Sequence, residues 1–422
     1  MPQSTPRPAA RIAAASAAVI LTVAACRADE DTVQVNWWGG TERDEITQEA
    51  LAAFEEQSEV SVSGESVDED GYFDRLATAS AGGNAPEVFT LGGAYAGEYA
   101  DRDALLDLET ESEQLDLSGL DEAALENGQF DGVQYGLPTG SNAVALIVNP
   151  EIFEEAGVEQ PDPQTWTWDD FAEISEQISE NTDDDVYGTD AILDSTMIGV
   201  YARQQAETLY TEDGEIGVSD DSLEDLFTLA QDLTESGAAP PAAVVTELEG
   251  AAPEETLIAT NRAAMSVEWS NNLATLASTA DAGLEIWTLP EESEIPGVAP
   301  LSSQYWAISA DAEDPEGAAE LLNFLVNDEQ AVETLSIDRG VPDNPQMREA
   351  LEGTLGEHEQ AEVDYIDEIS SKDTAPDFID PPGSTAVEDI TVRTVNDLLH
   401  DGLSPEDAVD RWLKESLDAV EG

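Results

Sequence analysis

The sequence predicts an α/β protein with two domains, and three observations lead to this expectation. Short apolar strands alternate with amphipathic helices from residue 32 to residue 91, which is typical of an open sheet covered by helices. Residues 143–148 form a continuous apolar run, interpreted as a buried strand that crosses into a second domain. The 422 residues suffice for two domains, each with its own core.

The first domain is expected to begin in the order β-α-β-α-β. A strand starts at Thr32 and leads into the Trp37-Trp38-Gly39-Gly40 turn. Thr41 is the expected N-cap of the next helix, because Asp44 stands three residues later in a capping-box position. The elements expected after it are a strand at 60–62, a helix at 72–79, a loop at 81–86 and a strand at 87–91. Open sheets bind ligands at the carboxyl ends of their strands, so the ligand is expected at that edge.

The second domain is expected to be mainly helical between residues 151 and 260, with Thr167 as the cap of one helix. Trp166 and Trp168 flank this cap and are assigned to packing of the second domain. The remaining elements expected are strands at 261–268, 284–289 and 305–309, of which the last returns to the first domain, and helices at 315–332 and 385–420.

Acidic residues dominate the charge of the chain. It carries 94 Asp and Glu against 14 Lys and Arg, a formal charge of -80 spread along its whole length. Self-repulsion is unfavourable in dilute salt, but at 1 M salt the screening length falls to about 3 Å. The composition is therefore interpreted as an adaptation to high salt, with an acidic secreted protein at ordinary salt as the alternative. With no basic stripe to meet phosphates, nucleic acid is excluded as a partner, and anionic ligands are disfavoured.

Residues 1–25 are interpreted as a targeting segment. Arg7 and Arg11 precede an apolar run that is too short to span a bilayer and that ends in Val23-Ala24-Ala25-Cys26. This resembles a lipoprotein signal, in which the cysteine becomes the lipidated first residue of the mature protein. Residues 26–32 would then be the lipid anchor and tether, and the secreted protein would be held on the outer face of the cell membrane. A plain secretory signal with a chance cysteine is the alternative.

The sequence does not predict an enzyme. His358 and His400 are the only histidines, and neither has the spacing of a metal ligand or a cysteine partner. A nucleophile elbow and a phosphate-binding glycine loop with lysine are absent from the sequence. With 94 acidic residues, no pair stands out as a glycosidase pair. Neither a cofactor nor a metal is therefore expected.

Six short motifs, in this order along residues 33–420, carry a resemblance to a known family. They are Trp37-Trp38-Gly39-Gly40 after a strand; 72–86 running into a strand; Tyr135-Gly136-Leu137-Pro138 with Asn142 and Asn149-Pro150; Trp166-Thr167-Trp168; Ala263-Ala264-Met265 followed by Trp269; and Arg339-Gly340-Val341-Pro342. In these features the chain resembles the extracellular solute-binding proteins of ABC importers, in the family 1 branch typified by maltodextrin and other sugar binders. One departure is Leu301-Ser302-Ser303-Gln304, where the family often has Gly-Gly-Ser.

The resemblance implies a two-lobed periplasmic-binding-protein-like fold, in which each lobe is an open sheet flanked by helices and crossing hinge strands join the lobes. The first lobe is expected at 33–142 plus 303–338, and the second at 143–302 plus 339–422. The implied function is capture of a neutral mono- or oligosaccharide in the cleft and delivery to the permease subunits of an ABC importer by hinge closure. A monomer is expected.

A sugar presents apolar ring faces and a rim of hydroxyls, so its site needs flat aromatic rings and many polar groups. Trp37 and Trp38 alternate on a strand, so one is expected in the core and one at the cleft. Trp269, with the amides that follow it, is the strongest single candidate. The complete set of expected ligand contacts is Trp37, Trp38, Gly39, Gly40, Tyr95, Asn142, Trp269, Ser270, Asn271, Ser303, Gln304, Tyr305 and Arg339.

A binder of a polyol or of a cationic compatible solute is the alternative, because a cation can use aromatic rings and acidic groups together. The cleft distinguishes the two. At least two aromatic platforms with amides and carboxylates favour sugar, whereas an aromatic box without hydroxyl partners favours a quaternary cation.

Overall fold

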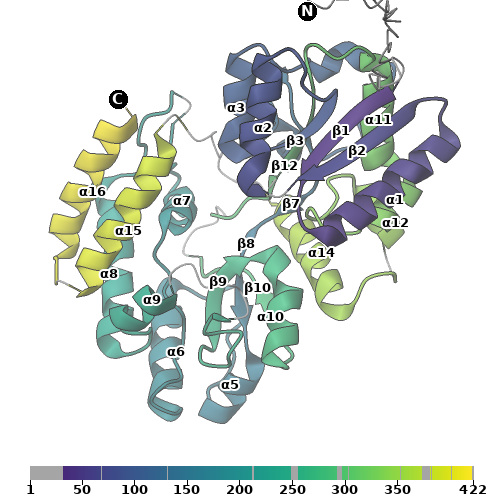
Figure 1. Ribbon diagram of the computed structural model, residues 1–422. Coiled ribbons are helices and arrows are strands. Elements are labelled where there is room, and N and C mark those ends of the chain that lie inside the picture. The colour runs from purple at the N-terminus through teal and green to yellow at the C-terminus, as the bar shows by residue number, and fades with distance from the viewer. Residues whose placement is uncertain are drawn as a thin grey trace, which may run out of the picture.

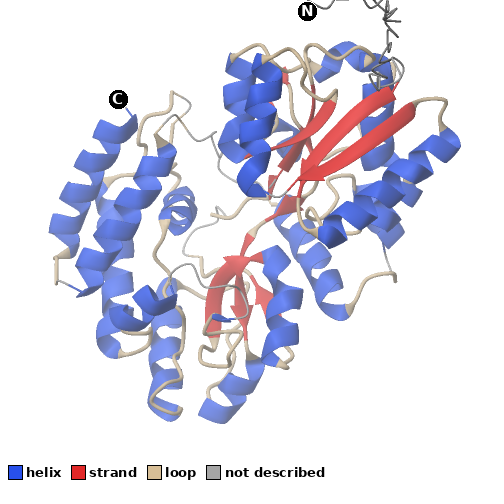
Figure 2. Cartoon of the chain, in the orientation of Figure 1, coloured by secondary structure: helices blue, strands red, loops and turns tan. Residues whose placement is uncertain are grey.

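The computed structural model describes residues 32–67, 69–130, 132–211, 213–248, 255–291, 297–302, 304–351, 353–372, 381, 383–400 and 402–420. They form two lobes side by side, joined by a narrow region near β7 and β8 (Figure 1). Each lobe has its strands in the interior and its helices outside (Figure 2). Within the described ranges, no helix has both the length and the apolar character needed to cross a bilayer. The expected α/β fold is confirmed.

The first lobe is built on a five-stranded sheet of order β2-β1-β3-β12-β6. The strands are β1 (Thr32–Trp38), β2 (Ser61–Val67), β3 (Val88–Gly92), β6 (Leu137–Pro138) and β12 (Gln304–Ile308). β1 is parallel to β2 and β3, whereas β12 is antiparallel to β3 and β6. The surrounding helices are α1 (Thr41–Gln57), α2 (Glu69–Ala81), α3 (Gly93–Asp101), α4 (Glu122–Glu126), α11 (Pro315–Asn327), α12 (Glu329–Leu335) and α13 (Pro345–Leu351).

The second lobe has a smaller sheet, of order β10-β8-β9, and more helix. The strands are β8 (Val144–Val148), β9 (Met265–Trp269) and β10 (Glu285–Trp287). All five residues of β8 are buried, as its continuous apolar run predicts. The helices are α5 (Pro150–Ala156), α6 (Trp168–Asn181), α7 (Ser195–Gln204), α8 (Asp220–Ser236), α9 (Ala242–Leu248), α10 (Leu273–Ala280), α14 (Glu357–Ser370), α15 (Ser384–His400) and α16 (Pro405–Val420).

Local sequence signals place several helix ends. Thr167 caps α6, as predicted, and the structure adds a reciprocal capping box with Asp170. Thr41, in contrast, is the first residue of α1, and the N-cap is Gly40, which has no side chain to bond the helix. The single helix expected at 315–332 is two helices, because Asp328 has an extended backbone and its carboxylate caps α12.

Each lobe has its own apolar core. The second-lobe core includes Trp166 and Trp168, which confirms their assignment to packing. In the first lobe, Trp37 lies in the cluster beneath α1 and α11, whereas Trp38 lies in a separate cluster with Tyr72 and Tyr305.

The lobes are joined where three segments of backbone meet. β7 (Ser141–Asn142) pairs antiparallel with β11 (Leu301–Ser302). Ser141 also exchanges two backbone hydrogen bonds with Val341, at 2.8 and 2.9 Å. Gly140 and Gly340 cross next to this pair with positive φ angles of 155° and 105°. A Cβ on Gly340 would lie 2.7 Å from the carbonyl carbon of Gly140, so only glycine fits this crossing.

After this crossing the chain stays with the first lobe for longer than the sequence suggests. α13 packs against α12, and the Asn344 amide donates to Asn327 on α11 at 2.8 Å. α14, in contrast, packs on α10 and β10 of the second lobe. We therefore propose that the third passage between lobes lies between α13 and α14, rather than at the expected boundary of residues 338 and 339.

Candidate functional site

The register of the strands brings the carboxyl edge of the first sheet next to the hinge. The parallel strands β1 and β3 end at Trp38 and Gly92, and α1 and α3 begin beyond them. Gln304 on β12 pairs with Gly92, and Ser302, two residues earlier, pairs with Ser141 in β7. Two paired segments, close together in the sequence, therefore connect the strand ends of the first lobe with the hinge.

Three aromatic rings form a wall on the first lobe. The rings of Trp38 and Phe73 have centroids 5.2 Å apart. Phe73 stacks on Tyr95 with a centroid distance of 3.8 Å and an interplanar angle of 5°. Tyr95 is 42% exposed, whereas Trp38 is 7% exposed. Tyr95, at the start of α3, is therefore the ring that this wall presents to solvent. Phe73 was not expected here, since in the sequence it reads as one more apolar residue of α2.

Three further candidates lie at the end of β1 or just after it. Trp37 has no exposed surface and packs in the core, so it is not part of the site proposed below. Gly39 has a φ of 149°, and a Cβ there would lie 2.5 Å from the side chain of Arg43. Gly40, the cap of α1, faces open space. Nothing is described of the side chain of Glu42 beside them.

The hinge carries buried polar side-chain atoms without partners. The Oδ1 atom of Asn142, the Oγ atom of Ser302 and the Oε1 atom of Gln304 have no hydrogen-bond partner among the described residues. These side chains are 4%, 8% and 6% exposed, respectively. An unsatisfied buried polar group costs about 1–3 kcal/mol, so each of these three oxygens has unused hydrogen-bonding capacity in the observed arrangement. Ser303, which lies between two of them, is outside the described residues.

The second lobe contributes an exposed tryptophan close to the same hinge strand. Trp269 ends β9, pairs with Val144 and is 38% exposed. Ser270 is fully buried: its N–H donates to the carbonyl of Ala143 at 2.8 Å, and its Oγ accepts from the N–H of Ala143 at 3.2 Å. Through these two hydrogen bonds, Ser270 holds the end of β9 against Ala143. Trp269 is thereby fixed close to Asn142. Asn271 is exposed at the same turn.

The residue before this tryptophan on β9 is the carboxylate Glu268. Glu268 accepts hydrogen bonds from the Ser266 hydroxyl at 3.0 Å and from the Asn272 amide at 3.2 Å. Burial raises its pKa, and the charges of Asp190 and Asp194 raise it further. Burial also raises the pKa of Asp194, although this residue is solvent-exposed and caps α7.

Arg339 and Tyr305, expected at the ligand, are instead buried. The Nη2 of Arg339 donates to the Thr47 hydroxyl on α1 at 2.8 Å, and its guanidinium lies 5.4 Å from the ring centroid of Trp306. Burial lowers its pKa to about 10, and the nearby charge of Arg43 acts in the same direction. Tyr305 is 6% exposed and packs in the cluster of Trp38. Both residues therefore have packing roles in the first lobe, and their contact with a ligand stays a prediction.

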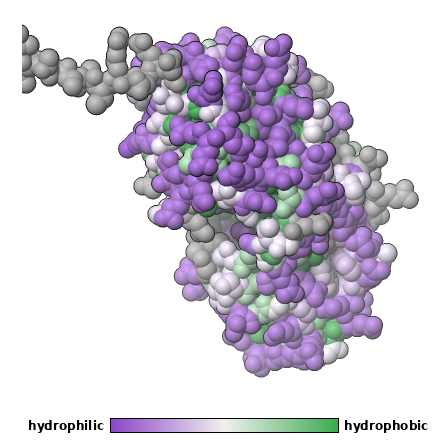
Figure 3. Space-filling view, turned by 90° about the vertical axis from the view of Figure 1, so that its right-hand side faces the viewer, coloured by the Kyte–Doolittle hydropathy of each residue, from purple (hydrophilic) through white to green (hydrophobic). Residues whose placement is uncertain are grey.

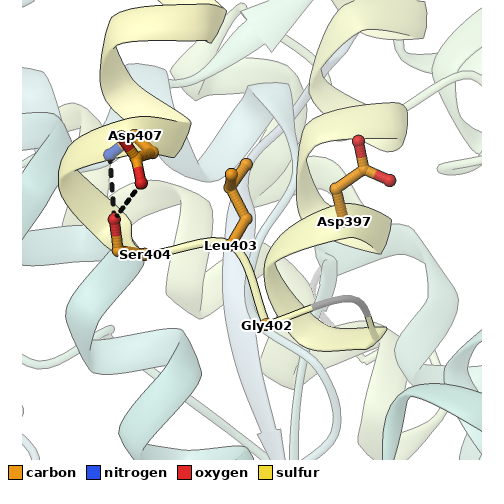
Figure 4. Close-up of a pocket in the computed structure, with 5 residues that line it drawn as sticks. All are labelled: Asp397, Gly402, Leu403, Ser404 and Asp407. Carbon is orange, nitrogen blue, oxygen red and sulfur yellow. Dashed lines mark hydrogen bonds between the residues drawn. The ribbon is translucent and has the colours of Figure 1, made fainter.

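Two pockets that are open to solvent have linings that include none of the candidate contacts above. One, of about 350 Å³, is lined by Asp397, Gly402, Leu403, Ser404 and Asp407 at the turn between α15 and α16 (Figure 4). There the Ser404 hydroxyl donates to Asp407 and accepts from its N–H, which is a helix cap. The other, of about 340 Å³, lies between α2 and the strands β1 and β2. In the described part of the chain, no group of histidine, cysteine or acidic residues is arranged to hold a metal ion.

Comparison with known proteins gives one family. The family model described as bacterial extracellular solute-binding protein matches residues 49–358. A lactose-binding protein of Rhizobium radiobacter is 26% identical over 108 residues, which is 26% of this chain and 25% of that protein. The match therefore spans about a quarter of the length of this curated relative.

Solved structures agree on the fold. A family 1 extracellular solute-binding protein of Alicyclobacillus acidocaldarius has a TM-score of 0.80 at 24% identity, covering 93% of this chain and 98% of that one. A periplasmic oligogalacturonide-binding protein of Yersinia enterocolitica gives 0.78 at 20% identity, with 92% and 99% covered. The GacH receptor of Streptomyces glaucescens, solved unliganded and with acarbose, gives 0.71 at 17% identity, with 92% and 98% covered. At these identities the likeness shows the fold alone.

Proposed function

The chain belongs to the family of bacterial extracellular solute-binding proteins, and from this premise we propose that it binds a neutral mono- or oligosaccharide between its lobes and delivers it to an ABC importer. The proposed contacts are Trp38, Tyr95, Asn142, Trp269, Asn271, Ser302 and Gln304, with backbone approach at Gly39 and Gly40 and with Glu268 and Asp194 as hydroxyl acceptors.

One observation carries this proposal. Only four large hydrophobic residues are exposed in the described ranges. Val392 and Leu417 lie on the outer helices α15 and α16, whereas Trp269 ends β9 in the second lobe and Tyr95 lies in the first turn of α3, just after β3, in the first lobe. An exposed ring at each side of a hinge is what two sugar platforms require. Burying about 50–100 Å² of apolar surface on each ring would contribute roughly 1–2.5 kcal/mol.

The polar groups near these rings support sugar over the alternative ligand. A cationic compatible solute would be favoured by the carboxylates of Glu268 and Asp194, whose pKa values are raised by burial. However, Glu268 is already bonded by a hydroxyl and an amide, and Trp269 is accompanied by Asn271 and Asn272. One ring per lobe with amides and unpartnered oxygens matches hydroxyl recognition better than it matches an aromatic box.

The proposed mechanism is closure of the two lobes about the hinge. The ligand stabilises the closed form only to the extent that it binds this form more tightly, so contacts from both lobes are required. Tyr95 and Trp269 supply one such contact each. The closed, loaded protein would then dock on the permease subunits as a monomer.

We propose no catalytic activity, in keeping with the binding role of the family. His358 lies in the first turn of α14, and the Nε2 of His400 is 3.0 Å from the Thr246 hydroxyl on α9. Neither histidine adjoins the carboxylates near Trp269.

A thermal-shift screen of the purified protein tests the proposal. We also propose that the acidic surface, which is mostly hydrophilic on the face in Figure 3, is adapted to high salt, so the screen uses about 2 M salt. The panel contains mono- and oligosaccharides, polyols, betaine and amino acids. A ligand at 100 times its Kd adds about 2.7 kcal/mol to the free energy of unfolding, so a sugar is expected to raise the Tm. A shift with betaine alone would favour the alternative, and no shift with any compound in a folded sample would contradict the sugar proposal.

We further propose that Cys26, which lies outside the described residues, is lipidated and anchors the secreted protein to the membrane. In an expressing cell, the protein is expected in the membrane fraction, and Cys26→Ser is expected to move it to the medium. Cys26→Ser protein that stays in the membrane fraction would contradict the anchor. Ser4→Ala, a change upstream of the apolar run, serves as the control.

A further inference from the structure

One buried arginine connects the two lobes. Arg348 on α13 is 7% exposed, and its Nη1 donates to Asp121 Oδ2 at 2.9 Å and to the carbonyl of Pro342 at 2.7 Å. Its Nε lies 2.7 Å from Asp367 Oδ1 on α14. Asp121 precedes α4 in the first lobe, and α14 packs on the second lobe. A single guanidinium therefore holds the first lobe, a hinge segment and the second lobe together.

Burying the Arg348 guanidinium costs free energy, and named partners offset this cost. The chain has only 14 Lys and Arg, and a buried cation needs partners to offset the loss of its hydration. Arg348 has two carboxylates and a carbonyl as partners, of which Asp367 is the more exposed carboxylate. The ion pair between Arg348 and Asp367, which is not a hydrogen bond, is therefore the contact that a change in lobe arrangement would break most readily.

A second acid lies against the same hinge. Asp343 is 4% exposed, and its Oδ2 has no hydrogen-bond partner in the described part of the structure. Its carbonyl accepts from the N–H of Asp121 at 2.8 Å. Its side chain faces Ser141 on β7, and the charged groups that act on it are Asp121 and Arg348. Burial raises the pKa of Asp343 to about 7; the Asp121 charge adds to the shift, whereas Ser141 and Arg348 oppose it.

We propose that Asp343, Arg348 and Asp367 form a proton-sensitive latch across the hinge, which holds the lobes in the observed arrangement while Asp343 is protonated and releases them when Asp343 ionises. An ionised Asp343 would be a buried charge with one unpartnered oxygen. The cation available to it is Arg348, so ionisation draws the guanidinium toward Asp343 and weakens the ion pair with Asp367.

The direction of the pH effect follows from this geometry. Below pH about 7, Asp343 carries its proton in the observed arrangement, and Arg348 stays with Asp367. An arrangement that hydrates Asp343 would bring its pKa back toward that of an ordinary aspartate. Raising the pH therefore shifts the population away from the observed arrangement, without any ligand.

Spin-label distances between the lobes test the latch. Labels at Glu56→Cys on α1 and Glu176→Cys on α6, both exposed positions, would be placed in the full chain carrying Cys26→Ser. The ligand-free distance distribution is expected to change between pH 5.5 and pH 8.5, with a midpoint near 7. Asp343→Asn is expected to keep the low-pH distribution at both values. Asp367→Asn, an exposed change that leaves the core intact, is expected to show the high-pH distribution at both values.

Asp364→Asn is the matched control, because it removes a charge from α14 at an exposed position that does not contact Arg348. It should retain the wild-type response. A wild-type distribution that does not change with pH, or a pH response that persists in Asp343→Asn, would overturn the latch.

Discussion

Trp269→Ala is expected to weaken sugar binding by about 5- to 70-fold while leaving the Tm of the ligand-free protein nearly unchanged. The reason is that Trp269 is 38% exposed at the end of β9, so its ring face is available to a ligand and contributes little to the core. Losing a platform that buries about 50–100 Å² removes roughly 1–2.5 kcal/mol of binding free energy. Calorimetric titration with the sugar identified in the screen gives the affinity directly.

Two variants make this result specific. Trp269→Phe keeps a flat apolar face and is expected to recover part of the affinity. Val392→Ala removes an equally exposed apolar side chain on α15 and is expected to bind as the wild type does. An affinity of Trp269→Ala equal to that of the wild type would remove this ring from the site, even if the protein still binds sugar.

The sequence was sufficient to predict the elements whose own pattern determines them. The continuous apolar run at 143–148 predicted a buried strand, and Thr167 predicted a helix start. The break between α11 and α12 was missed, because the apolar spacing continues across Asp328 and only its extended backbone ends the first helix. Periodicity indicates which face is buried, but it does not detect a one-residue interruption.

The site was harder to predict, since it depends on packing between distant segments. Alternation on β1 predicted that Trp37 and Trp38 point to opposite faces, but it could not predict that one is wholly buried and the other is 7% exposed. Glu268 and Asp194 could not be distinguished in the sequence, because 94 acidic residues give every stretch a carboxylate. Burial raises the pKa of both residues, as it does for several other acids of the chain, and this burial arises from packing that the sequence does not show.

Arg339 illustrates the same limitation of site prediction from the sequence. As one of very few cations, and at a hinge turn, it was a reasonable ligand contact. In the folded chain it donates to Thr47 on α1 and lies over Trp306, so it stabilises the first lobe next to the hinge. Scarcity of a residue type indicates that its position matters, and the fold adds the structural partners of Arg339, which the sequence could not identify.

Gly340→Ala is expected to have the largest effect on stability, because the hinge brings two stretches of backbone into contact at this position. The φ of Gly340 is 105°, a conformation that costs a non-glycine residue about 1–3 kcal/mol. The new Cβ would also lie 2.7 Å from the carbonyl carbon of Gly140 and 2.9 Å from the N of Ser141, and overpacking of this kind adds about 1–3 kcal/mol. Denaturant unfolding should therefore show a loss of about 2–6 kcal/mol.

Gly237→Ala separates the two contributions. Gly237 ends α8 with a φ of 82°, and a Cβ there would meet no atom within 4 Å, so only the backbone strain applies. The excess loss in Gly340→Ala over Gly237→Ala then measures the contact between the hinge segments. Equal losses in the two variants would mean that the segments separate at little cost, and the hinge would then be a loose connection between lobes. A clear excess would show that the backbone crossing at Gly140 and Gly340 is a fixed point, about which the lobes rotate when a ligand draws Tyr95 and Trp269 together.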